Sequence, residues 1–198
     1  MDIIAEDQGV SVRTMIIENE LEIAVPVERA WLLLLDIPFV APCLPGTSLT
    51  TVVDERTYEG QVALKLGPVS LAFSGQAVIE EIDPVSRTVR VAAKGREERG
   101  RGSAHATVSF TLAQAGEGTR VAVATDLMLA GSIIQYARGA GVITRTAQQL
   151  VDQFAERLHQ RIESGEVPAG ADIKVGSLLW QGIMAGLPNK GPGGTGPT

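Results

Sequence analysis

The sequence predicts an α+β fold: a curved antiparallel sheet of about seven strands wrapped on one long C-terminal helix, with two short helices after the first strand. Three observations support this prediction. Apolar and acidic residues alternate over 15–25, which is typical of a half-buried strand. Residues 48–129 form a run of further alternating segments separated by turn sequences. Apolar residues recur every three or four positions over 143–162, which indicates an amphipathic helix.

The two short helices are expected directly after the first strand. Pro26 suits the first turn of a helix, because its fixed φ angle is helical and its missing N–H is not needed there. Pro38 cannot continue that helix, so the helix ends before it. A second short helix is expected over 38–43, and Gly46 then permits the chain to turn into the next strand.

The run of strands predicts a meander. The expected strands are 48–54, 57–66, 69–82, 86–97, 102–113 and 118–129. Turn residues such as "DPVSR" at 83–87 and "AGEGT" at 115–119 separate them. Connections this short imply that successive strands pair antiparallel. Because a sheet with one apolar face needs a cover, we expect it to curl around the long helix.

The 198 residues suit one domain with a tail. We interpret 1–14 as an N-terminal extension, 15–165 as the domain and 166–198 as a C-terminal tail containing the apolar segment 173–187. As a helix, that segment has one apolar face, expected to dock on a membrane or a partner: Leu179, Trp180, Ile183, Met184 and Leu187. Its length of roughly 22 Å is too short to span a bilayer core of about 30 Å. Two alternatives are open: packing on its own domain, or no ordered structure.

The charge balance argues against nucleic acid as a partner. The chain has 17 basic and 23 acidic residues, a net charge of -6, and no basic cluster of the size that phosphate binding needs. Arg96, Arg99 and Arg101 form a short basic run, but Glu97 and Glu98 interrupt it. This run is expected to be a solvated hairpin tip.

No residue stands out as catalytic or metal-binding. A single cysteine, Cys43, excludes an internal disulfide and a cysteine-rich metal site. No neighbouring cation in the sequence would lower its thiol pKa, so we expect it to be a packing residue. Alternation places His105 and Asp126 on the solvent side of their strands, and His159 falls on the charged side of the long helix. We therefore predict no metal, no catalytic residue and no enzymatic activity.

Four stretches carry a family resemblance. They are "AWLLLLD" at 30–36, "CLPG" at 43–46, "YEGQVALKLGPVSLAFSG" at 58–75 and "AGSIIQYARGAGVITRTAQQLVDQFAERL" at 130–158. In this combination the chain resembles the carbon monoxide dehydrogenase CoxG family, which belongs to the SRPBCC, or START-like, helix-grip superfamily. The resemblance covers roughly 15–164.

The resemblance implies an apolar cavity between sheet and helix. The residues supply a partly independent argument, since small side chains recur on the strand faces where a compact core would use large ones. Close packing of helix on sheet remains the alternative. The predicted lining residues are Leu44 at the mouth, then Val62, Leu64, Phe73, Gly75, Ala77, Ala106, Val108, Phe110, Tyr136, Ile143, Ala147, Leu150 and Phe154.

The function implied is that of a non-enzymatic binding protein for a lipid or isoprenoid quinone, held without a covalent bond. It would serve a molybdenum-containing carbon monoxide dehydrogenase, or a related oxidoreductase, by membrane recruitment or electron-acceptor delivery. The expected partners are this lipophilic molecule, oxidoreductase subunits and a membrane surface. Alternatives are an assembly or maturation factor and a polyketide cyclase-like enzyme. The acidic start lacks a signal peptide, so we expect a cytoplasmic protein, with peripheral contact at the inner face of the cytoplasmic membrane as an option.

Overall fold

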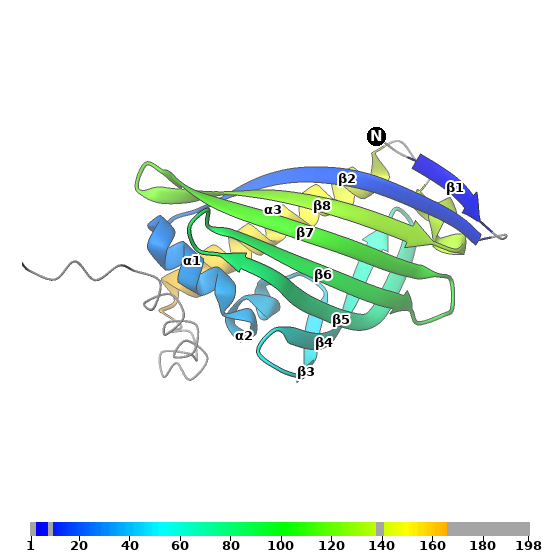
Figure 1. Cartoon of the computed structure of the whole chain (residues 1–198), viewed down its shortest axis with the longest axis horizontal. Coiled ribbons are helices and arrows are strands. Elements are labelled where there is room, and N and C mark those ends of the chain that lie inside the picture. Colours follow the sequence, from blue (N-terminus) through cyan, green and yellow to red (C-terminus); the bar gives the residue numbers. More distant parts are fainter. Residues whose placement is uncertain (1–2, 8–9, 138–140, 166–198) are drawn as a thin grey trace, which may run out of the picture. The chain divides into compact units, whose positions relative to one another are not determined.

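The computed structural model describes residues 3–7, 10–137 and 141–165. It confirms the predicted helix-grip fold: an antiparallel sheet curls around the long helix α3 (Val142–Glu163), which lies behind the sheet in Figure 1. The strands are β1 (Ile3–Asp7), β2 (Val10–Ile23), β3 (Thr47–Val52), β4 (Thr57–Leu66), β5 (Val69–Asp83), β6 (Thr88–Glu97), β7 (Ser103–Ala115) and β8 (Gly118–Ala130). Their order in the sheet is β1-β2-β8-β7-β6-β5-β4-β3.

The sheet has eight strands, one more than predicted, because residues at the N-terminus extend it. β2 begins at Val10 and not near residue 15, and β1 pairs with its first residues from Ile3↔Thr14 to Asp7↔Val10. The weakly patterned segment 1–14 therefore supplies strand residues. Pairing of this kind rests on backbone hydrogen bonds, which leave no alternating pattern in the sequence.

The predicted short helices are present as α1 (Val27–Leu35), α2 (Ile37–Val40) and a 3-10 turn η1 (Ala41–Cys43). Asp36 separates the first two, because its side chain accepts a hydrogen bond from the backbone N–H of Phe39 at 3.0 Å and so caps α2. A second 3-10 turn, η2 (Ser132–Ala137), precedes α3.

Gly46 has the conformational role expected of it. Its φ angle is +71°, and a Cβ there would overlap the carbonyl oxygen of Ala63 on β4. Its own carbonyl accepts the N–H of Ala63 at 2.8 Å. Only glycine combines this left-handed conformation with such a close approach.

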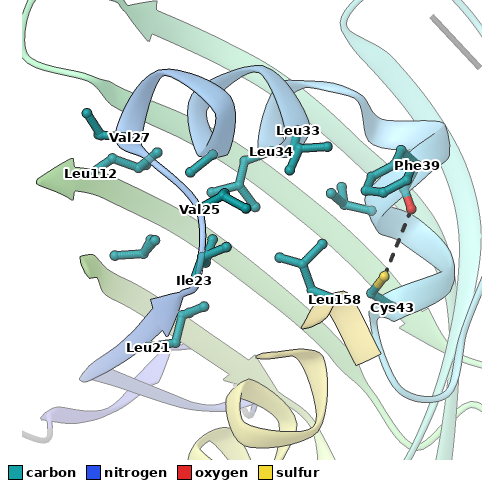
Figure 2. Close-up of a cluster of buried hydrophobic side chains, with 13 residues drawn as sticks. Leu21, Ile23, Val25, Val27, Leu33, Leu34, Phe39, Cys43, Leu112 and Leu158 are labelled. Atoms are coloured by element: carbon teal, nitrogen blue, oxygen red, sulfur yellow. Dashed lines mark hydrogen bonds between the residues drawn. The ribbon is translucent and has the colours of Figure 1, made fainter. Parts of the chain in front are cut away.

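The core consists of two separate clusters at opposite ends of the sheet. The Ile23 cluster, shown in Figure 2, joins the end of β2 to α1, α2, η1 and the last turns of α3. Its buried members are Leu21, Ile23, Val25, Val27, Ala30, Leu33, Leu34, Phe39, Val40, Cys43, Leu112, Val121 and Leu158. The Phe73 cluster joins β2, β4, β5, β8 and η2 to the start of α3. Its buried members are Met15, Ile17, Leu66, Leu71, Phe73, Leu129, Ile133, Ile134 and Ile143.

Candidate functional site

Between the two clusters, the inner face of the sheet carries a patch without bulky side chains. Two neighbouring rows of inward positions contain glycine and alanine: the first runs across β4 to β7, and the second runs across β5 to β7, because Tyr58 stands at its β4 position. One row is Gly60, Gly75, Gly95 and Ala104, and the next is Ala77, Ala93 and Ala106. We call these seven residues the small-residue floor. They alternate along their strands with exposed outer residues, as the buried Phe73 and Ile79 do.

The small-residue floor is only partly buried. All seven residues keep some accessible surface, whereas the inward residues in the two clusters are buried. In a close-packed interior, inward positions in the middle of a sheet would lose almost all of their accessible surface. Gly60, Gly75 and Gly95 also line a groove on the outer face, so only the alanines bear on the inner face. Ala77, Ala93, Ala104 and Ala106 are less completely buried than the inward residues of the two clusters.

Helix α3 runs along the inner face of the sheet from the Phe73 cluster to the Ile23 cluster. It contacts β2 near one side of the sheet and β4 near the other, so the sheet curls around it. Ile143 and Ala147, at the start of the helix, pack in the Phe73 cluster, and Phe154 and Leu158 pack in the Ile23 cluster. Leu150 lies between these two contacts and is only partly buried.

Most residues predicted to line a cavity lie on this inner face. Those with partly exposed side chains are Val62, Leu64, Ala77, Ala106, Val108 and Phe110. Gly75 belongs to the floor, Phe73 and Ile143 are buried in the Phe73 cluster, and Tyr136 packs against that cluster. The structure therefore brings together residues from strands and from α3 that the sequence pattern placed on matching faces.

Leu44 does not join them. Its side chain is 42% exposed and belongs to neither cluster, while Cys43 and Pro45 on either side of it are buried. The backbone N–H of Leu44 donates to the carbonyl of Ala41 at 3.1 Å, which closes η1 and turns Leu44 away from the core. Sequence motif alone did not show which side of this turn would face inward.

Cys43 is a packing residue, as predicted. It is 2% exposed and lies in the Ile23 cluster near Leu158 and Phe39 (Figure 2). Its Sγ atom lies 4.0 Å from the carbonyl oxygen of Phe39, the distance of a weak hydrogen bond from a thiol.

His105 and Asp126 are exposed on the outer face of the sheet, which confirms their predicted orientation. His159 was expected at the surface but is partly buried. Its Nε2 atom accepts the backbone N–H of Ala24 at 3.1 Å and so ties the end of α3 to the end of β2. This contact joins residues 135 positions apart, so no local pattern could indicate it.

The expected solvated tip at 96–101 is wrong for two of its residues. Glu97 is only 4% exposed, and its carboxylate accepts hydrogen bonds from the Arg101 side chain at 2.6 Å and from the backbone N–H groups of Arg99 and Arg101 at 2.9 and 3.1 Å. Arg96, Glu98 and Arg99 are exposed as predicted. The sequence did contain a signal for this burial. Glu97 lies two residues after Gly95, so strand alternation places both residues on the inner face of β6.

Arg101 connects three segments around this carboxylate. Its Nη2 atom also donates to the carbonyl of Ser70 at 3.0 Å, its guanidinium carbon lies 5.8 Å from the centre of the Tyr136 ring, and its carbonyl accepts from Ser132 Oγ at 3.0 Å. The hydrogen bond from Arg101 lowers the pKa of Glu97 to about 2, although burial acts in the opposite direction. Glu97 in turn raises the pKa of Arg101, so the pair is ionised at neutral pH.

The outer face carries a shallow groove behind the floor, with a volume of about 720 Å³. Polar side chains line it, among them Gln61, Ser74, Gln76, Lys94, Arg96 and His105, and the floor glycines Gly60, Gly75 and Gly95 also line it. Its polar lining distinguishes it from the apolar inner face, so it does not correspond to the predicted cavity.

Within the described ranges, no group of three or more His, Cys, Asp or Glu side chains is arranged to hold a metal ion. Nor is any helix in these ranges long and apolar enough to cross a membrane. The predicted docking residues of the tail lie outside the described residues: Leu179, Trp180, Ile183, Met184 and Leu187.

Several solved structures share this fold. A conserved protein from Geobacillus kaustophilus superimposes with a TM-score of 0.65 at 19% identity, covering 76% of this chain and 96% of that one. A Thermus thermophilus protein superimposes with a TM-score of 0.56 at 18% identity, covering 77% of this chain and 100% of that one. The Zhui aromatase/cyclase from Streptomyces sp. R1128 superimposes with a TM-score of 0.54 at 13% identity, covering 79% of this chain and 98% of that one. At such identities the likeness shows the fold alone.

Sequence comparison identifies the family. A search of curated proteins found no match to this chain. The family model for CoxG, a subunit of carbon monoxide dehydrogenase, in contrast matches residues 20–163, from the last residues of β2 to the end of α3. This match covers most of the chain and all of the small-residue floor, and the chain therefore belongs to the CoxG family.

Proposed function

We propose that this protein is a non-enzymatic binding protein that holds a lipophilic ligand, a lipid or an isoprenoid quinone, against the small-residue floor. The observation that carries this proposal is the partial exposure of inward apolar side chains between two buried clusters, among them Ala77, Ala106 and Val108. A Cβ atom at Gly60 or Gly75 would overlap a backbone carbonyl of the neighbouring strand, so the argument depends on the side chains that are present. Close packing would bury these side chains as fully as those of the two clusters.

The dimensions and chemistry of the floor support an apolar ligand. Strands lie about 4.8 Å apart, so four strands give a floor roughly 14 Å wide, and two rows add about 7 Å along the strands. Val62, Leu64, Val108 and Phe110 surround the floor with partly exposed apolar surface. Covering such surface contributes about 0.8 kcal/mol for each buried methylene.

Membership of the CoxG family supports the choice of partner. The proposed client is a molybdenum-containing carbon monoxide dehydrogenase or a related oxidoreductase. An isoprenoid quinone is both lipophilic and an electron acceptor, so one ligand class would link the cavity to redox service. The apolar segment 173–187 would supply the contact with a membrane or with the client.

The chemistry of the inner face supports binding over catalysis. General acid–base catalysis needs a titratable group that can exchange a proton near neutral pH. Glu97 is the buried carboxylate of the described core. Its three hydrogen bonds lower its pKa to about 2, so it is ionised near neutral pH. It is therefore a poor proton acceptor. Because an aromatase/cyclase shares this fold, a cyclase-like enzyme is the alternative to be tested.

The first experiment identifies the ligand. Freshly purified full-length protein is examined by native mass spectrometry, and its organic extract is analysed for lipids and quinones. We expect a bound lipophilic molecule, or uptake of decylubiquinone when it is supplied. Protein that is ligand-free and takes up neither decylubiquinone nor lipid would contradict the proposal.

A pair of variants connects binding to the floor. Ala106→Phe places a ring on the floor, and His105→Phe places the same ring on the outer face of the same strand. We expect Ala106→Phe to reduce ligand loading about tenfold or more, and His105→Phe to leave it unchanged, with both variants folded. If Ala106→Phe loses its ligand yet still supports the oxidoreductase in cells, the assembly-factor alternative is correct.

A further inference from the structure

The outer face of the sheet, which is turned to the reader in Figure 1 with α3 behind it, carries the polar groove. We call it the outer groove. Gly60, Gly75 and Gly95 pair side by side across β4, β5 and β6 and line its base with backbone atoms. Outward side chains flank this glycine row in two walls: Glu59, Gln76, Lys94 and His105 in one, and Gln61, Ser74, Arg96 and Ser103 in the other. The walls stand two residues apart along each strand, about 7 Å, which leaves room for one extended polypeptide chain.

Lys94 and Arg96 place one positive charge in each wall, both on β6. In the part of the chain that the structure describes, no carboxylate forms an ion pair with either of them, whereas Arg120, also on the outer face, pairs with Glu20 at 3.1 Å. Their cross-strand neighbours are hydrogen-bonding side chains: Gln76 and His105 beside Lys94, and Ser74 and Ser103 beside Arg96. The outer groove therefore offers two cations and several hydrogen-bond donors to a negatively charged ligand.

Two exposed apolar side chains lie beyond the β7 side of the outer groove. Met128 on β8 pairs with His105 and is 43% exposed, and Ile16 on β2 is 63% exposed. Because Ile16 pairs with Asp126, two residues before Met128, it is a diagonal neighbour of Met128 across the two strands. An apolar surface that adjoins hydrogen-bonding and charged groups is the usual composition of a protein–protein interface. This pair therefore favours a protein partner over a small anion.

Acidic residues limit how far negative charge can extend along this surface. Glu59 stands in the outer groove on β4, Glu98 accepts a hydrogen bond from Ser74 at 2.9 Å, and Asp126 lies beside Ile16. A long polyanion such as nucleic acid would meet these like charges near the two cations, which is unfavourable. The arrangement therefore fits a short acidic stretch that continues into an apolar residue.

We propose that the outer groove and the Met128–Ile16 pair bind an extended acidic segment of another protein. Successive side chains of an extended chain point to opposite sides, so two adjacent carboxylates reach Lys94 in one wall and Arg96 in the other. The step from β6 to β8 is about 10 Å, the length of three extended residues. The apolar residue that covers Met128 therefore stands about three positions from the acidic pair. The inference goes beyond the carrier function and does not depend on it, because α3 lies against the opposite face.

Fluorescence polarisation with labelled synthetic peptides tests the proposal on the full-length protein. In the two probes, a pair of adjacent glutamates either precedes or follows a leucine by three positions, within a glycine–serine background. Control peptides carry glutamine in place of both glutamates, or serine in place of the leucine. We expect the protein to bind one of the two probes about tenfold more tightly than its glutamine version, roughly the effect of two exposed charge pairs. This preference should shrink as salt is added.

Substitutions in the outer groove make the test specific to its two cations. Lys94→Gln and Arg96→Gln should each weaken the glutamate probe about threefold, and the double variant should no longer distinguish glutamate from glutamine. Arg90→Gln is the matched control, because Arg90 is an exposed residue on the same strand that removes the same charge outside the outer groove. Thermal unfolding verifies that each variant is folded.

A second pair of variants tests the apolar contact. Met128→Ser should weaken the leucine-containing probe about fivefold and leave the serine version unchanged, because only the leucine covers this side chain. Val85→Ser is the control, since Val85 is 92% exposed on the β5–β6 turn and lies outside this surface. It should leave the binding of both peptides unchanged.

The outcomes separate this inference from the carrier function. The inference is wrong if wild-type protein binds neither probe, binds the glutamate and glutamine peptides equally well, or loses as much affinity in Arg90→Gln as in Lys94→Gln. It is also wrong if pyrophosphate displaces the probe and Met128→Ser has no effect, because the outer groove then takes a small anion. Protein that binds the probe as expected but takes up no decylubiquinone or lipid would contradict the carrier function and support this inference.

Discussion

The two ends of the molecule are closed in different ways. At the end that contains α1, the Ile23 cluster closes the sheet mainly with apolar side chains, including Leu158 and Ile23 at 0% and 1% exposure, and the buried hydroxyl of Thr119 donates to the carbonyl of Val25 at 2.7 Å. At the other end, apolar packing in the Phe73 cluster is combined with the buried pair Glu97 and Arg101, which ties the β6–β7 hairpin to Ser70 and to η2.

Because the two ends are closed differently, their stability should depend on different properties. Apolar closure depends on volume and shape, so the Ile23 end should respond to changes in side-chain size and hardly to pH. The Glu97 end depends on ionisation, so it should respond to pH and to charge changes. Partly buried residues between the two clusters, such as Leu150, should respond less to truncation than residues within a cluster.

The largest effect is expected at the turn beside the Ile23 cluster. Gly46→Val forces a β-branched residue to a φ of +71° and drives its Cβ into the carbonyl of Ala63, so we expect a loss of more than about 3 kcal/mol in the free energy of unfolding. Gly67→Val is the control, since Gly67 has a similar φ of +61° but open space around it. Urea unfolding measures both variants. Equal losses would show that the contact with Ala63 is unimportant.

The next effect compares a cluster with the floor. Leu158→Ala removes a fully buried side chain and should lower the free energy of unfolding by about 2–5 kcal/mol. Leu150→Ala, on the same helix but between the clusters, should cost clearly less because Leu150 is only partly buried. Urea denaturation of both variants measures the contrast. A Leu150→Ala loss as large as that of Leu158→Ala would mean that the space in front of the floor is packed.

A third effect distinguishes the Glu97 end by pH. The pKa of Glu97 is lowered from 4.5 to about 2 in the folded state, so its contribution to stability is complete above about pH 4.5 and is lost as the pH falls towards 2. Urea unfolding between pH 6 and pH 2.5 should show this loss, and Glu97→Gln should lose less stability over the same interval. Parallel pH profiles for wild type and Glu97→Gln would refute the assignment.

The smallest effect is expected at Cys43. Its thiol lies in a packed site and donates a weak hydrogen bond to the Phe39 carbonyl. In Cys43→Ser the hydroxyl can donate to the same carbonyl, so we expect the substitution to lower the free energy of unfolding by only about 1 kcal/mol. Ligand loading should stay the same as in wild type, measured by native mass spectrometry. A folded Cys43→Ser protein that no longer takes up ligand would show that the thiol has a functional role.

Local periodicity explains how much could be predicted. All six strands expected within 48–129 are present with boundaries within two residues, and the long helix differs by one residue at each end. The same alternation assigned the inward sides of β4, β5 and β7 correctly, because the strand period of two relates each residue to its neighbours in the chain. Positions of the floor such as Gly75, Ala77 and Ala106 follow from that parity.

Contacts between distant segments were not predictable in this way. Glu97 was predicted to be solvated because it is charged, although strand alternation places it on the inner face. Its burial is tolerated because Arg101 pairs with it and is itself held by contacts to Ser70 and η2. The hydrogen bond of His159 to Ala24 and the outward turn of Leu44 likewise depend on which segments meet.

The sequence by itself determined the elements, their order, the apolar side of each and the family, because these are written in local spacing and in motifs. Only the tertiary structure decided that the apolar residues form two clusters with a partly exposed floor between them. The curl of the sheet sets how far α3 stands from each strand, and that distance decides which inward residues are packed. The same tertiary contacts bring Arg101 to Glu97, so that the buried carboxylate is paired.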